Sequence, residues 1–149
     1  MPFTQNALDQ FFSTYERDSL SDDPAKAAGH FAEHFLAAGP QGPVTVPAAV
    51  FAQKLPARKQ LFNDAGLTST ELTSRRDLRL GDRYVLVETE WKMNFRPESQ
   101  PDTNLAVSSS FLIDMGSSEP KIIAYIPHQD VFQLMKERKL LPPDEGPGS

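Results

Sequence analysis

The spacing of the apolar residues changes near Gly66, and this change constrains the fold more than any other feature of the sequence. Before Gly66 they recur every three or four residues, which is the period of a helix with one buried face. After Gly66 they recur at every second residue, the period of a strand. Because the helical segments precede the strands instead of alternating with them, the sequence predicts an α+β fold.

Three helical segments are predicted in the first part of the chain. They span residues 4–20, 24–38 and 47–62, with a short strand at 44–46. Phe31 and Phe35 lie on the expected buried face of the second helix, which should end at Gly39 and Pro40. Pro56 should kink or split the third helix.

Four long strands follow, over residues 72–80, 85–95, 105–115 and 121–126, with a last helical segment over 128–141. The strand at 121–126 is apolar enough to be covered on both faces, so we expect it in the centre of the sheet or at an interface. A strongly curved antiparallel sheet packed on three N-terminal helices encloses a cone. We expect an apolar cavity in this cone, between the inner face of the sheet and the first two helices.

Length, composition and charge narrow the classes of function. A chain of 149 residues predicts one domain, here residues 1–141, and the Pro- and Gly-rich residues 142–149 have the composition of a flexible tail. The net charge of −5 argues against nucleic acid and anionic membranes as partners. The chain has no cysteine and begins without a secretory signal pattern, which leads us to expect a cytoplasmic protein. No cofactor fingerprint is found, so we expect no cofactor.

The order of these elements resembles the nuclear-transport-factor-2-like (NTF2-like) superfamily. Two segments carry the resemblance: residues 85–91, similar to a tryptophan-bearing strand of SnoaL-like members, and residues 121–131, similar to their closing strand and its Asp-containing turn. The resemblance implies a cone-shaped roll, also called cystatin-like. It also implies a homodimer formed through the sheet. Members include isomerases, cyclases, dehydratases and non-catalytic binding modules, so the function stays open.

Tyr15 is the first candidate site residue. It lies on the inward side of the first helix, where ketosteroid isomerases of this superfamily place a tyrosine that stabilises an enolate oxygen. Their aspartate base comes from the first short strand, but residues 44–46 of this chain contain no carboxylate. The alternative is that Tyr15 is an amphipathic core residue with a hydrogen-bonded hydroxyl group.

His30 and His34 are four residues apart and fit, with Glu33, the inverted zinc-protease pattern. A zinc site needs a third protein ligand, and the only other histidine, His128, is in a distant element, so we predict no metal. His34 is instead expected to face the cavity, where it could act as an acid or base near neutral pH.

Arg76 has the same parity as the apolar residues of its strand. It should therefore be buried with a partner or reach a ligand; alternatively, a bulge turns it outward to pair with an acid. Phe31 and Trp91 are expected as cavity walls, and Ser109 as a polar contact on the inner face. The neighbouring Ser108 and Ser110 lack the signature of a nucleophile and are interpreted as ordinary strand positions.

These predictions favour a protein that binds a small apolar or aromatic molecule. The proposed polar contacts are Tyr15, His34, Arg76 and Ser109. An enzymatic version would be cyclisation, isomerisation or dehydration, in which His34 moves a proton and Arg76 or Tyr15 stabilises an oxyanion. The alternative is a non-catalytic interaction or dimerisation module with a filled core.

Overall fold

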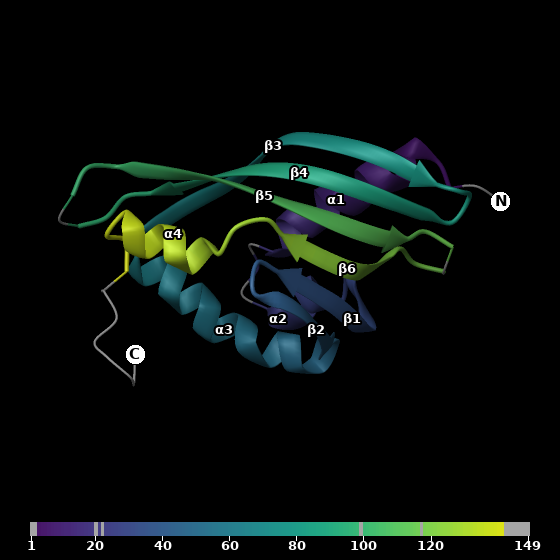
Figure 1. Cartoon of the computed structure of the whole chain (residues 1–149), viewed down its shortest axis with the longest axis horizontal. Coiled ribbons are helices and arrows are strands. Elements are labelled where there is room, and N and C mark those ends of the chain that lie inside the picture. Colours follow the sequence, from purple (N-terminus) through teal and green to yellow (C-terminus); the bar gives the residue numbers. More distant parts are fainter. Residues whose placement is uncertain (1–2, 20, 22, 99, 117, 142–149) are drawn as a thin grey trace.

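The computed structural model describes residues 3–19, 21, 23–98, 100–116 and 118–141. Four helices and six strands are found among them (Figure 1). Their order is α1 (Gln5–Ser19), α2 (Pro24–Ala28), β1 (Phe31–Gly39), β2 (Gly42–Pro47), α3 (Ala48–Asp64), β3 (Leu67–Leu80), β4 (Tyr84–Phe95), β5 (Thr103–Asp114), β6 (Lys121–Pro127) and α4 (Val131–Glu137). The predicted tail at 142–149 lies outside the described residues. None of the helices within these ranges is long and apolar enough to cross a membrane.

The six strands form one curved sheet in the order β2-β1-β6-β5-β4-β3. Neighbouring strands are antiparallel except β1 and β6, which are parallel, so the sheet is mixed. β6 lies inside the sheet, as its continuous apolar sequence predicts. The α+β fold predicted from the change of period is confirmed.

Side chains fix the starts of the helices. The hydroxyl oxygen of Thr4 accepts a hydrogen bond from the amide of Ala7 at the start of α1. The carboxylates of Asp23 and Asp130 cap α2 and α4 in the same way. These caps satisfy amides that have no partner within their helices.

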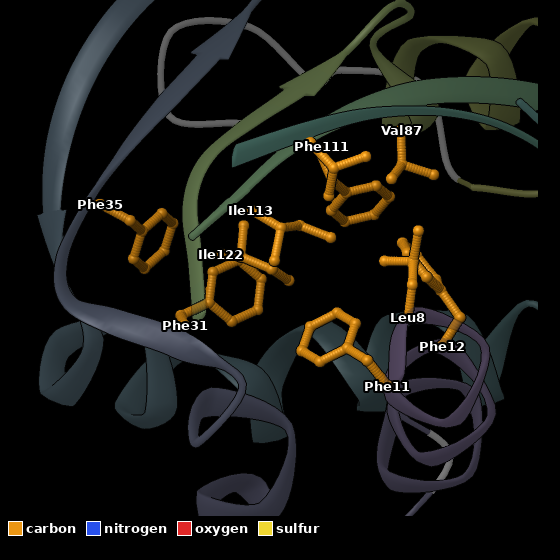
Figure 2. Packing of buried hydrophobic residues seen from close by; sticks show 10 residues of the cluster. Leu8, Phe11, Phe12, Phe31, Phe35, Val87, Phe111, Ile113 and Ile122 are labelled. Atoms are coloured by element: carbon orange, nitrogen blue, oxygen red, sulfur yellow. The ribbon is translucent and has the colours of Figure 1, made fainter. Parts of the chain in front are cut away.

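The main core lies between α1 and the inner face of the sheet. From α1, Leu8, Phe11 and Phe12 point toward the strands that carry Val87, Phe111, Ile113 and Ile122 (Figure 2). Burial of one such side chain contributes roughly 1.5–3 kcal/mol. A second cluster, around Met93, Phe95 and Met135, packs α3 and α4 against the other end of the long strands.

The predicted second helix is wrong beyond residue 28. Residues 31–39 form strand β1, which pairs with β2 and β6. The four-residue spacing of the buried Phe31 and Phe35 is a multiple of two, so it fits a strand as well as a helix. The local pattern therefore does not distinguish a helix from a strand. Pairing with two neighbouring strands makes the segment a strand.

The strand predicted at 72–80 does not keep one residue parity on its buried face. A bulge lies between Leu72 and Ser74, so the residue parity reverses along β3. Arg75 and Asp77 consequently face inward and Arg76 faces outward. The third helix differs in a smaller way, because α3 continues past Pro56 without splitting.

Candidate functional site

A cavity of about 760 Å³ lies on the inner face of the sheet. Its walls come from α1, α3, parts of β3 to β6, the β1–β2 turn and the start of α4. The sequence placed the cavity against the first two helices, but α3 and α4 replace α2 as the walls of this space. Partly buried members of both core clusters, such as Trp91 and Val107, line it.

Two phenol groups lie in the cavity wall. Tyr15 of α1 and Tyr125 of β6 line both the large cavity and an adjoining cavity of about 220 Å³. Burial raises the pKa of each phenol above its usual value, and strongly so for Tyr15. Both hydroxyl groups therefore stay protonated near neutral pH and can donate hydrogen bonds to a ligand.

A short chain of hydrogen bonds fixes the polar groups of the sheet beside the phenols. The indole Nε1 of Trp91 donates to the Oγ1 of Thr89 over 2.8 Å, and that hydroxyl donates to the carbonyl of Ser109 over 2.9 Å. The Oγ of Ser109, also 2.9 Å from Thr89 Oγ1, then acts as the donor between the two hydroxyls. Its lone pairs remain available to accept a hydrogen bond from a molecule in the cavity.

Arg58 lies among aromatic rings at the edge of the cavity. Its guanidinium carbon is 5.2 Å from the ring centre of Phe62 and 5.0 Å from that of Phe132. The two rings are stacked on each other, with centres 5.5 Å apart. This arrangement joins α3 to α4 and places an exposed cation beside the apolar cavity.

The predicted site residues fall into three groups. Tyr15, Trp91 and Ser109 line the large cavity, while Phe31 is a core residue that lines the smaller one. His34 is exposed on β1, so its expected inward position is wrong. Arg76 is exposed on the outer face, where it donates to Glu88 over 2.7 Å. The bulged alternative for Arg76 is therefore confirmed, and the three candidate catalytic residues do not come together.

The His30–His34 motif is divided by the start of β1. The Nε2 of His30 lies 2.7 Å from a carboxylate oxygen of Asp18 at the end of α1. This hydrogen bond is the largest contribution that lowers the pKa of Asp18. Across the ranges that the structure describes, no three histidine or acidic side chains gather as metal ligands.

The serine run of β5 is divided between the two faces of the sheet. Ser109 points inward, whereas the hydroxyl groups of Ser108 and Ser110 each lie 2.8 Å from a ring nitrogen of His128. His128 is thus hydrogen-bonded to both outward serines, an arrangement that the sequence did not predict.

Sequence reasoning also missed Arg58, Tyr125, Thr89 and Phe132 as residues of the site. The sequence does place Arg58 and Phe62 on one face of a helix, because they are four residues apart in a helical segment. Thr89 and Trp91 share the inward parity of their strand. The approach of Phe132 to this group depends on the path of the chain after β6, which no local pattern carries.

Solved structures with similar folds were found, whereas no protein-family profile and no curated protein sequence matches the chain. An NTF2-like protein with a cystatin-like fold from Novosphingobium aromaticivorans has a TM-score of 0.68, with 10% identity, over 93% of this chain and 88% of that one. A proposed scytalone dehydratase from the same species has a TM-score of 0.64 with 13% identity, over 82% and 80% of the two chains. The β subunit of benzoate 1,2-dioxygenase from Burkholderia mallei gives 0.63 with 11% identity, over 90% and 95%.

These similarities define the class of fold. The chain has the NTF2-like, or cystatin-like, fold, as the order of its elements predicted. At such low identities the comparison establishes the fold alone, and members of one fold carry out unrelated functions.

Proposed function

We propose that this chain binds a small, largely aromatic molecule in the cavity of its curved sheet. The observation that carries the proposal is the cavity itself, whose volume of about 760 Å³ falls in the usual range for small-molecule sites. Aromatic and aliphatic walls surround a few fixed polar groups, namely the phenols of Tyr15 and Tyr125 and the hydroxyl of Ser109. We also propose that the chain is a SnoaL-like member of this fold class, because residues 85–91 and 121–131 resemble segments of SnoaL-like proteins.

The polar groups favour binding over proton-transfer catalysis. No histidine lines the large cavity among the described residues, and Asp130 is the single carboxylate there. Asp130 caps α4 through the amide of Gln133 and also accepts from the side chain of Gln41. The two buried phenols are donors and not bases, because their pKa values are raised.

Binding of the neutral probe N-phenyl-1-naphthylamine tests the proposal. We expect the probe to bind the unmodified chain, and Val107→Phe to weaken binding at least about tenfold because the added ring fills the cavity. The matched control is Val44→Phe on β2, where the side chain is 58% exposed and lies outside the cavity lining. A titration by probe fluorescence, with circular dichroism of each variant, measures both effects. Equal binding by Val107→Phe and the unmodified chain would contradict the proposal.

A second candidate function is self-association through the outer face of the sheet. One observation favours it: cross-strand partners form an apolar row over five strands, made of Leu78, Leu86, Leu112, Ala124 and Leu36. Leu78 is 57% exposed and Leu36 is 39% exposed. A second copy of this chain could cover the row without blocking the inner cavity, so a homodimer is compatible with ligand binding.

A further inference from the structure

Arg58 differs from most other arginines of the chain in its partners. Arg17, Arg75, Arg76, Arg83 and Arg96 each form an ion pair with a carboxylate. For Arg58, no ion pair with a carboxylate is found within the described ranges. Its contacts are instead the faces of Phe62 and Phe132, in a chain whose net charge is −5.

The aromatic contacts hold the guanidinium group without using its hydrogen bonds. A guanidinium that lies over ring faces keeps its five N–H donors, and the contact limits the side-chain entropy that binding would cost. Because Phe62 and Phe132 also line the large cavity, the rings hold the cation where a molecule in that cavity can reach it.

The other charges at this edge of the cavity do not neutralise Arg58. Lys59 lines the same cavity, and its ammonium group donates to the carbonyl of Ser21. Asp130 is engaged by the amide of Gln133 and the side chain of Gln41. Among the described residues that line the cavity, Asp130 is the single carboxylate, and its printed hydrogen bonds go to groups other than Arg58. Burial raises the pKa values of Tyr15 and Tyr125, and the positive charge of Arg58 opposes this rise. The charge of Arg58 therefore acts on groups that line the cavity.

We propose that the ligand is an aromatic molecule with an anionic group, such as a carboxylate or sulfonate, and that Arg58 binds that group at the edge of the cavity. This inference rests on the proposed function. The aromatic body lies against Trp91 and Phe111, while the anion accepts hydrogen bonds from the planar guanidinium group. Arg58 is thus a specificity-determining residue, because it favours acidic over neutral aromatic molecules.

Two probes that differ by one anionic group test the inference. N-phenyl-1-naphthylamine is neutral, and 1-anilinonaphthalene-8-sulfonate adds a sulfonate to the same aromatic body. We expect Arg58→Gln to weaken sulfonate-probe binding about tenfold, which is about 1.4 kcal/mol, and to change neutral-probe binding less than twofold. Added salt should weaken binding of the sulfonate probe to the unmodified chain more than its binding to Arg58→Gln.

Arg76→Gln is the matched control, since Arg76 lies on the outer face and should leave both affinities unchanged. Equal sulfonate-probe affinities for the unmodified chain and Arg58→Gln would overturn the inference. Equal weakening of binding for both probes would also overturn it, because Arg58 would then contribute only packing contacts to the cavity lining. In both cases the proposed function is still supported if Val107→Phe weakens binding of the neutral probe. Neutral-probe binding that Val107→Phe does not weaken contradicts the proposed function itself.

Discussion

Asp18 and His30 form a nearly buried pair that joins the end of α1 to the start of β1. Their side chains are only 12% and 15% exposed. The ring of His30 also packs edge-on against Phe11 and Tyr15, with ring centres 5.4 and 5.8 Å apart. The pair therefore positions Tyr15 beside the cavity although neither residue lines it.

Removal of the Asp18 carboxylate should destabilise the fold. We expect Asp18→Ala to lower the free energy of unfolding by about 1–3 kcal/mol, because a ring nitrogen of His30 loses its partner in a nearly buried position. The folded-state pKa of Asp18 lies below its ordinary value of 3.8. The stabilisation is therefore fully present above that value and is lost as the pH falls through the lower, folded-state pKa.

Urea unfolding at several pH values measures this effect. The difference in unfolding free energy between the unmodified chain and Asp18→Ala should shrink below about pH 4. Asp64→Ala, an exposed acid at the end of α3, is the control and should have a small effect. A difference that grows as the pH falls below about 4 would contradict the role given to Asp18.

The face of the sheet on which a side chain lies could be predicted where no bulge interrupts the alternation of the strand. Trp91 and Ser109 face inward as expected, since β4 and β5 pair in register without a bulge. Arg76 could not be placed, because the bulge between Leu72 and Ser74 depends on pairing with β4. His34 was misplaced for a related reason, namely that its segment was predicted as a helix.

At the scale of elements, the long strands β3 to β6 and the helices α1 and α3 could be predicted from the sequence. All of these except β6 have a period that repeats often enough to exclude the other structure, and β6 was predicted from its continuous apolar sequence. The segment 31–39 has only two widely spaced phenylalanines, and their spacing of four fits both periods. Its structure follows from the backbone hydrogen bonds that β2 and β6 supply, which only the folded sheet contains.

The apolar row on the outer face makes an element-scale prediction. If a second copy covers the row, the unmodified chain should have about twice the monomer mass of 16.6 kDa in solution. Leu78→Lys should then shift the equilibrium to the monomer, because it places a charge in the covered surface. Leu61→Lys on α3, where the side chain is 44% exposed, is the matched control. Analytical ultracentrifugation measures the masses, and a monomeric unmodified chain would contradict the homodimer.

At the scale of the whole molecule, the fold combines two packed clusters with a cavity between the sheet and the helices. A cavity lined by apolar walls and fixed polar groups is the arrangement expected of a binding site. The central claim is therefore that the cavity, and not another surface, receives an aromatic ligand.

The most direct test of this claim uses Trp91, which is the single tryptophan of the chain and lines the cavity. Its emission overlaps the absorption of N-phenyl-1-naphthylamine, so a probe bound in the cavity quenches it by energy transfer. We expect a saturable loss of Trp91 emission with one probe per chain, and in Val107→Phe a midpoint at a probe concentration at least about tenfold higher. Bound probe that leaves Trp91 emission unchanged, or an equal quenching midpoint in Val107→Phe, would contradict the account.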